Sequence, residues 1–549
     1  MSASIFGSWT ASSHNFFNIS LLLTLVLTIF ILFSVGFLFA VTALKARREH
    51  GILPKSLPWS GRYNELLASF RANVRGATES AKLFTQGYYK YSKEGKIYVV
   101  PTWTKGPQVI VPPSMINWLA HQPSDDLNAK DCTFENMQFK YTVHHPEITH
   151  NDMLDLLIKR DLTRTIGTLN DEISEELELG MEDLFGTDTD SWKEVGVWDS
   201  MITTVARTAN RVFVGPELCR NKVYLKSCSD WTRDIQVSGA ILHMFPKFMK
   251  SAISWFATIP NRRDTRINMK HSVPLVAQRI QDMTEKLNNP TSQYEEPNDL
   301  LSWMVRESFK RSTPSERTPE ALAYRLLLLN FAAVSTSTIG ATNAVLDIIS
   351  APDALQIMAA LREEAQRVLD EHGGVWTKAA VSKLYRIDSV LRESARVSGV
   401  GGTGLARRVR PENGIVLQDG TWVPKGATVG VAQGGIHFDE EYYDHPNVFD
   451  AFRFSRAREE KLVDAAPGEA PKNEDLVTTS PHFLAFSYGS HACPGRFFAA
   501  NQLKLIVAHL VLNYDIQPLP FRSANTPLGD VMIPPVKVTM QIRRRAMKA

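Results

Sequence analysis

Cysteine is scarce in this chain of 549 residues, which contains only Cys132, Cys219, Cys228 and Cys493. None of them belongs to a Cys-x-x-Cys pair or to another spacing that is typical of structural zinc. Four scattered cysteines are also too few to form a disulfide scaffold in a chain of this length. We therefore expect the catalytic part of the protein to lie in a reducing compartment.

An excess of charge of one sign is also missing. The formal net charge is only +3, and the basic residues form no long run, which argues against a nucleic-acid partner. Hydrophobic residues make up 44% of the chain and charged residues 22%, and these are ordinary values for a globular protein. The composition therefore excludes global disorder and allows a sizeable core.

The N-terminal region lacks charge altogether over residues 16–44, which are long enough to cross about 30 Å of hydrocarbon as a helix. The density of Leu, Ile and Phe argues against a buried core helix. A cleaved signal peptide fits poorly, because no positive segment precedes the run and no clear cleavage site follows it. Lys45, Arg47 and Arg48 come directly after it, so the positive-inside rule places the N-terminus in the lumen and the remainder in the cytosol.

These features predict four parts of the chain: a short lumenal N-terminus (1–15), a transmembrane helix (16–44), a basic flank with a proline-rich hinge (45–62) and a cytosolic catalytic domain (63–549). Asn18 begins a glycosylation sequon, which we expect to be poorly accessible at the membrane edge. The acidic, proline-containing residues 464–475 are expected to form an exposed insertion.

Helical spacing dominates the catalytic domain. Residues 202–221 and 353–372 have apolar positions three and four residues apart, and the second segment ends at two glycines. Residues 326–346 carry no charge but contain seven polar side chains, which indicates a buried helix across the core rather than a second membrane span. Strands are expected late in the chain, within residues 414–431 and 536–542. The predicted fold is mainly α with small β-sheets.

Cys493 lies in the stretch "FSYGSHACPGRFFA", which is followed by an apolar helical pattern. Pro494 suits the first turn of a helix, where free backbone amides and the helix dipole would favour a thiolate. Gly489 and Gly495 permit close approach of a bulky flat group. These residues leave three interpretations open: a buried inert cysteine, a nucleophilic thiol, or a metal thiolate with a single protein ligand.

The stretch resembles the FxxGxRxCxG haem-binding signature of the cytochrome P-450 superfamily. Three further segments resemble motifs of the same family in the same order: "FAAVSTS" at 331–337, "ESAR" at 393–396 and "FDAFRF" at 449–454. The resemblance covers nearly the whole chain, and its details are similar to fungal microsomal members. It implies the cytochrome P-450 fold.

The resemblance also implies a set of functional residues around a haem b cofactor. Cys493 would be the axial ligand of the iron, and Glu393, Arg396 and Arg453 would form a charge network behind the haem. Thr336 would act at the oxygen site with Ser335 or Ser337 as helpers, although these hydroxyls could instead bond back to helix carbonyls. The other residues implied to contact the cofactor are Phe486, Gly489, His491 and Gly495.

Three departures from the family pattern concern the haem propionates and proton delivery. His491 stands where the family has an arginine, and Ser335 stands where it has an acid before the threonine. The usual Trp-x-x-x-Arg is absent. Candidates for the missing propionate contact are Lys159, Arg160 and Arg164, together with Arg407 or Arg408.

The activity implied by the resemblance is a monooxygenase that inserts one oxygen atom from O2 into a small lipophilic substrate. A separate NADPH-dependent reductase would supply electrons, because no flavin or nicotinamide domain is visible, and the enzyme would be anchored in the endoplasmic reticulum membrane. Two other classes stay open: a haem-thiolate isomerase or dehydratase that uses no external electrons, and a haem-binding sensor or membrane scaffold without turnover.

The substrate is the least determined feature. Residues 111–125, 331–335 and 400–405 are expected to wall the pocket, and they are apolar or small, which favours an uncharged lipophilic substrate. Resemblance to fungal secondary-metabolism members makes a terpenoid the first choice. A fatty acid and an aromatic polyketide remain alternatives.

Overall fold

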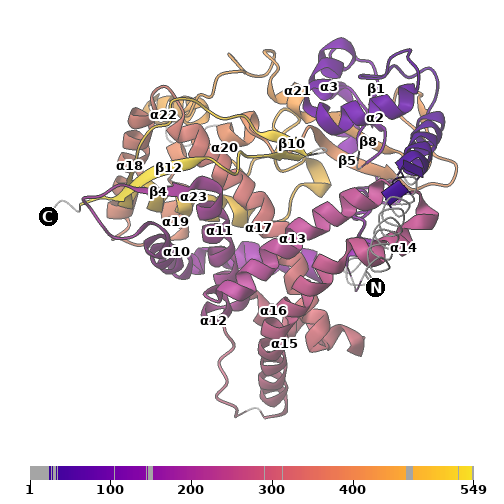
Figure 1. Cartoon of the computed structure of the whole chain (residues 1–549). Coiled ribbons are helices and arrows are strands. Elements are labelled where there is room, and N and C mark those ends of the chain that lie inside the picture. The colour runs from indigo at the N-terminus through magenta and orange to yellow at the C-terminus, as the bar shows by residue number, and fades with distance from the viewer. Residues whose placement is uncertain are drawn as a thin grey trace, which may run out of the picture.

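A computed structural model describes residues 35–103, 105–143, 145, 152–289, 291–311, 313–464, 474–528 and 531–546, together with residues 24, 25, 28, 32 and 33. The sequon at Asn18, residues 16–23 of the expected membrane helix and residues 465–473 of the acidic stretch lie outside this description. Within the described residues the fold is mainly helical with four small sheets, as predicted (Figure 1).

The longest helix is α17 (Pro319–Ile349), which crosses the centre of the protein (Figure 1). Thr318 caps it by accepting a hydrogen bond from the amide of Ala321, and Pro319 occupies its first turn. Among the described residues, it is the one helix long and apolar enough to span a membrane, but 72% of its most apolar stretch is buried in the protein. The prediction of a buried core helix is therefore confirmed.

The helices that pack directly on α17 include α11 (Val197–Val214), α13 (Lys222–His243), α15 (Ile259–Asn288), α20 (Tyr385–Val397) and α23 (Arg496–Asn513). On the outer side of α23 lies α18 (Ala354–Glu371), which buries Ile357, Leu361 and Val368. This helix ends at two glycines with positive φ, and the amide of Gly374 donates to the carbonyl of Leu369. The predicted amphipathic helix over residues 353–372 is confirmed.

The main sheet has five strands in the order β1 (Tyr98–Val100), β2 (Gln108–Ile110), β8 (Thr428–Ala432), β5 (Thr403–Val409) and β3 (Leu127–Asn128). The second sheet joins β4 (Lys193–Gly196), β12 (Thr539–Arg544) and β9 (Tyr514–Ile516). Two hairpins complete the sheets, β6 (Ile415–Val416) with β7 (Trp422–Val423) and β10 (Thr526–Leu528) with β11 (Val531–Ile533). The late strands were predicted, but the expectation that strands cluster late is wrong, because β1 to β4 all precede residue 200.

The smaller helices include α4 (Ile116–Ala120), α5 (Ala129–Asn136), α6 (Phe139–Thr142), α14 (Lys247–Ala257) and α22 (Arg453–Asp464).

The segment expected to be a basic flank and hinge, residues 45–62, is partly helical and partly packed on the domain. Residues 35–51 are helical and include the basic flank, and Leu53 and Leu57 after them are buried. Trp59 pairs with Val99 beside the main sheet, so residues 53–60 are fixed to the domain by packing and a backbone bridge.

Candidate active site

Cys493 lies in a tight loop in front of α23. A short 3-10 turn (Gly489–His491) precedes it, and its amide donates to the carbonyl of Phe486 at 2.8 Å. Gly489 has φ of 76°, and a Cβ there would come within 2.8 Å of the Cβ of Ala120 on α4, so this position requires glycine. The sequence predicted that Pro494 would lie in the first turn of the helix, but α23 begins two residues later, at Arg496.

Burial raises the pKa of the Cys493 thiol, while hydrogen bonding from the backbone amides of Gly495 and Arg496 acts in the opposite direction. The expected effect of the amides is present, but burial outweighs it. A thiolate at this position therefore needs a cation at its sulfur, which favours a metal ligand over a free nucleophile. No group of three or more His, Cys, Asp or Glu in the described part of the chain could hold a bare metal ion. A single thiolate is suited to an iron whose other ligands come from a macrocycle.

The other three cysteines offer no comparable environment. Cys132, Cys219 and Cys228 are buried, and burial raises the pKa of Cys219 and of Cys228 to about 12. These values are typical of inert structural thiols.

Helix α17 presents an open face in the middle of the core. Ala332 and Thr336 are exposed although the helix is otherwise largely buried, and their spacing of four residues places them on one side. The Thr336 hydroxyl donates to the carbonyl of Ala332 at 2.9 Å, and that of Ser335 donates to Phe331 at 3.0 Å. Both hydroxyls thus bond back to the helix, and their oxygens keep acceptor capacity. Ser337 is buried and lies off this face.

A buried positive charge lies near His491. Arg407 on β5 is buried, and its Nη2 finds no hydrogen-bond partner among the residues that the structure describes. Burial lowers the pKa of Arg407 to about 10. The pKa of His491 is lowered first by burial and then by the positive charges of Arg407, Lys159 and Lys130. This unbalanced positive field fits the carboxylates of a haem.

The remaining basic candidates for the propionates are engaged elsewhere or lie apart from His491. Arg160 pairs with Asp161 at 2.7 Å and with Glu307 at 3.0 Å. Arg408 lowers the pKa of Glu135 and so faces that carboxylate. Arg164 is exposed.

Glu393, Arg396 and Arg453 meet in one buried network. The Glu393 carboxylate accepts two hydrogen bonds from Arg396, at 2.8 and 2.7 Å, and one from Nε of Arg453 at 3.1 Å. The two guanidinium groups also donate to backbone carbonyls of the segment that precedes α22, for example those of Pro446 and Asp444. The structure thus joins residues that are 60 positions apart in the chain.

One of the expected pocket walls lies beside the cysteine loop. Within residues 111–125, α4 lies against the cysteine loop, where Ser490 donates to the carbonyl of Ala120 at 3.2 Å and Ser124 contacts His491 at 3.3 Å. This segment therefore borders the loop that carries Cys493.

Three segments that the sequence did not single out approach the expected walls. The ring of Phe139 on α6 lies 5.6 Å from that of Phe331, edge to face, and Trp231 on α13 lies 6.3 Å from it. The amide of Met532 on β11 donates to the carbonyl of Val400 at 2.8 Å. The sequence feature that could have indicated the first segment is a pair of phenylalanines in a polar stretch, Phe134 on α5 and Phe139 on α6.

Comparisons with known proteins agree with this geometry. The family model described as Cytochrome P450 matches residues 199–542. The chain is 32% identical to the cytochrome P450 monooxygenase gloP of Glarea lozoyensis, covering 90% of this chain and 92% of that one. It is 31% identical to the cytochrome P450 monooxygenase pbrC of Penicillium brasilianum, with 90% and 92% covered. The crystal structure of the cytochrome P450DA heme domain superposes with a TM-score of 0.63 at 14% identity, covering 89% of this chain and 98% of that one, which supports the fold.

Proposed function

The chain belongs to the cytochrome P450 superfamily and is a haem-dependent monooxygenase, and we propose that it inserts one oxygen atom of O2 into an uncharged lipophilic substrate of fungal secondary metabolism. The observation that carries the substrate class is the open face of α17, where Ala332 and Thr336 stand beside Phe331 without an ionised side chain. The fungal origin of the relatives supports the biological setting. A terpenoid is our first choice, with fatty acids and aromatic polyketides as alternatives.

Haem supplies the oxygen chemistry when it is bound, and the protein contributes the ligand, the orientation and the protons. We assign Cys493 as the axial ligand, with Phe486, Gly489 and Gly495 beside the macrocycle. Arg407 and His491 would bind the propionates, with Lys159 nearby, because Arg407 has an unpartnered donor within a buried positive field.

Thr336 is our candidate for holding a proton-delivering water. Its own proton is committed to the carbonyl of Ala332, so its oxygen accepts a hydrogen bond from a water on the open face of α17. Ser335 is partly exposed and is our preferred second hydroxyl for proton delivery, whereas Ser337 is buried away from this face. Because Ser335 replaces a carboxylate, any proton transfer at this position proceeds through ordered hydroxyls and not through an ionising side chain.

We assign a role in fold stability alone to Glu393, Arg396 and Arg453. Their hydrogen bonds tie α20 to residues 437–453, and the described contacts involve neither Thr336 nor Cys493. Electrons would come from a separate NADPH-dependent reductase.

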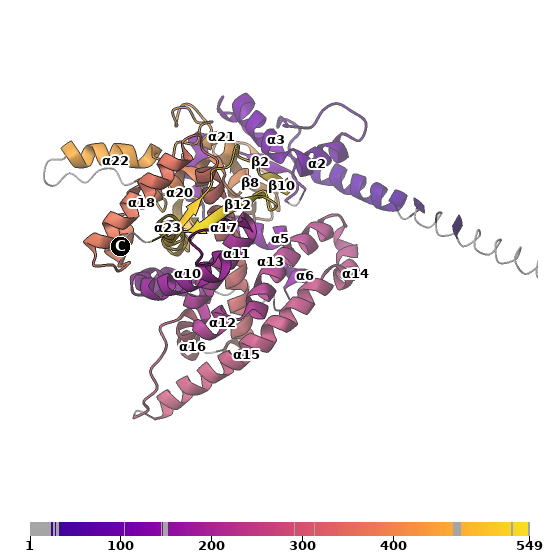
Figure 2. The same cartoon turned by 60° about the vertical axis from the view of Figure 1, so that its left-hand side comes forward.

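We further propose that the protein is anchored in the endoplasmic reticulum membrane by a single N-terminal span, with the catalytic domain in the cytosol. The helix over residues 35–51 projects from the body of the protein (Figure 2), and Val35, Phe37, Phe39 and Leu44 on it are exposed. Lys45 donates to the carbonyl of His243, just before α14. Helix α14 also exposes apolar side chains, including Phe248, Trp255 and Phe256. Two neighbouring apolar surfaces are expected at a membrane interface.

The proposed function is tested by co-expressing the chain with a fungal reductase and supplying panels of terpenoids, fatty acids and aromatic polyketides. We expect NADPH-dependent products that are heavier by one oxygen atom, and a red-shifted Soret band when the reduced protein binds carbon monoxide. Cys493→Ala should abolish this band, whereas the control Cys132→Ala should keep it. Oxidation of charged hydrophilic compounds alone would contradict the lipophilic pocket, and product formation without NADPH would indicate an isomerase or dehydratase.

A further inference from the structure

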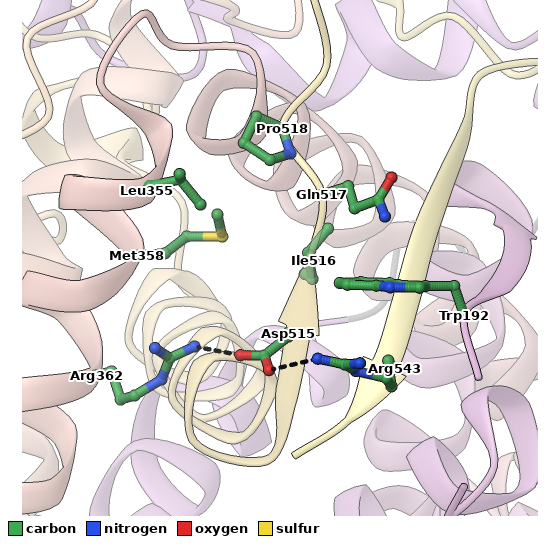
Figure 3. Close-up of a pocket in the computed structure, with 9 residues that line it drawn as sticks. All are labelled: Trp192, Leu355, Met358, Arg362, Asp515, Ile516, Gln517, Pro518 and Arg543. Carbon is green, nitrogen blue, oxygen red and sulfur yellow. Dashed lines mark hydrogen bonds and ion pairs between the residues drawn. The ribbon is translucent and has the colours of Figure 1, made fainter. Parts of the chain in front are cut away.

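A second pocket, of about 280 Å³, lies between α18 and the sheet of β4, β9 and β12 (Figure 3). It borders β9, which follows directly on the C-terminal end of α23, whereas Cys493 precedes the N-terminal end of this helix. Eighteen helical residues span about 27 Å. The pocket is therefore separate from the candidate active site.

Positive charge is in excess at one end of this pocket. Three guanidinium groups surround the single carboxylate of Asp515: those of Arg362 and Arg545 approach it at 3.2 Å, and that of Arg543 lies at 3.7 Å. Three positive charges against one negative charge leave a surplus of two. Nε of Arg543 is buried and has no hydrogen-bond partner in the described part of the chain. Arg362 also donates from Nε to the carbonyl of Val511 and from Nη2 to that of Tyr514, so the donor without a described partner at this end is Nε of Arg543.

The other end of the pocket is apolar. Leu355 and Met358 come from α18, Ile516 is the last residue of β9, and Pro518 follows that strand. Figure 3 shows Arg362 and Arg543 on either side of Asp515, with Leu355, Met358 and Pro518 grouped away from them. Trp192 forms a side wall, and the guanidinium of Arg543 lies 4.6 Å from the centre of its ring.

We propose that this pocket binds a small amphipathic carboxylate, whose apolar body packs on Leu355, Met358 and Trp192 while its carboxylate accepts hydrogen bonds from Arg543 and Arg362. Guanidinium groups favour carboxylates because two parallel N–H donors match two oxygens. A volume of 280 Å³ holds about nine groups of ~30 Å³, which matches a medium-chain or aryl acid. Inorganic phosphate would leave the apolar end empty, so it should bind poorly.

The test uses the full-length haem protein with its active site blocked by a tight azole ligand, so that a fatty acid cannot bind at the haem. Octanoate is titrated by calorimetry, with octanol and inorganic phosphate as separate probes. We expect octanoate to bind at least tenfold more tightly than octanol and phosphate to give no binding. Arg543→Gln should weaken octanoate at least tenfold.

The matched control is Arg367→Gln on α18, which also removes one guanidinium charge but takes it from an exposed pair with Glu371 that does not line the pocket. It should leave the affinity for octanoate unchanged. Arg543→Gln should fold normally, because Asp515 keeps Arg362 and Arg545, and an unchanged carbon monoxide band will verify this. Leu355→Glu is a second variant at an exposed position, and it should weaken octanoate because it sets a charged group against the apolar tail.

Several outcomes would overturn the proposal. They are an absence of octanoate binding by the wild-type protein, equal affinities for octanoate and octanol, and octanoate binding that neither Arg543→Gln nor Leu355→Glu weakens. Each is independent of whether the haem site oxidises a lipophilic substrate.

Discussion

Replacing Glu393 by Gln removes one negative charge while keeping the size of the side chain. In the folded protein the Glu393 carboxylate is fully buried and accepts hydrogen bonds from Arg396, from Arg453 and from the backbone amide of Asp450. The glutamine would turn an NH2 group toward at least one of these donors. Two buried or nearly buried guanidinium groups would lose their shared counter-charge.

The expected cost follows from this burial. Removing one partner of a fully buried ion pair costs about 3–5 kcal/mol, because the remaining charge stays desolvated without compensation. The pair of Arg367 and Glu371 on α18 offers a matched comparison, since it has the same chemistry on a helix but is half exposed. Glu371→Gln should cost far less, because exposed ion pairs on helices contribute little to stability.

The assay is urea unfolding followed by loss of the Soret band, with the two variants measured beside the wild type. We expect Glu393→Gln to lower the free energy of unfolding several times more than Glu371→Gln, and to increase haem loss during expression. If the two variants unfold at the same urea concentration, the buried network does not stabilise this fold and the reasoning fails.

Three further predictions concern catalysis, pH and topology. Thr336→Ala should keep its haem but lower the product formed per NADPH roughly tenfold, with the balance released as hydrogen peroxide, whereas Thr338→Ala, whose hydroxyl is buried and bonds to Val334, should not. An unchanged yield in Thr336→Ala would remove this residue from proton delivery. Burial lowers the pKa of His509 to about 4 from an ordinary 6.5, so the unfolded state binds its proton first as pH falls below 6.5. Stability should therefore drop by about 2 kcal/mol between pH 7 and pH 5 on account of this residue, and His509→Leu should flatten the profile measured by urea unfolding; an equally steep profile would contradict this. Protease added to sealed microsomes should digest the catalytic domain, and full protection would invert the proposed topology.

The sequence alone determined the elements whose signals are local. The uncharged stretch around Phe331 with its hydroxyls predicted α17, and the periodicity before two glycines predicted α18. The resemblance of "ESAR" to a family motif implied that Glu393 and Arg396 belong to one charge network, and the cysteine loop was recognised from its own residues. Such signals arise within one or two turns of the chain, where backbone geometry fixes which side chains are neighbours.

The short early strands were beyond such reasoning. β1, β2 and β3 contain two or three residues each and are buried throughout, so they show no alternation that would separate them from loops or helix fragments. β2 and β3 are held in the sheet by β8 and β5, which lie some 300 positions later. The packing of Leu53 and Leu57 and the bridge from Trp59 to Val99 were likewise beyond local patterns, because they depend on residues elsewhere in the domain.

Only the tertiary structure decided which distant side chains meet. The sequence left several basic residues open as candidates for the propionates, and the tertiary structure brings Arg407 near His491 with its Nη2 lacking a hydrogen-bond partner among the described residues. The wall segment on α6 became visible only when Phe139 was found against Phe331. The second pocket assembles Trp192, Arg362 and Arg543 from three separate elements. Contacts of this kind depend on how whole helices and strands pack, and packing is set by the volume and burial of many side chains at once, which no local pattern encodes.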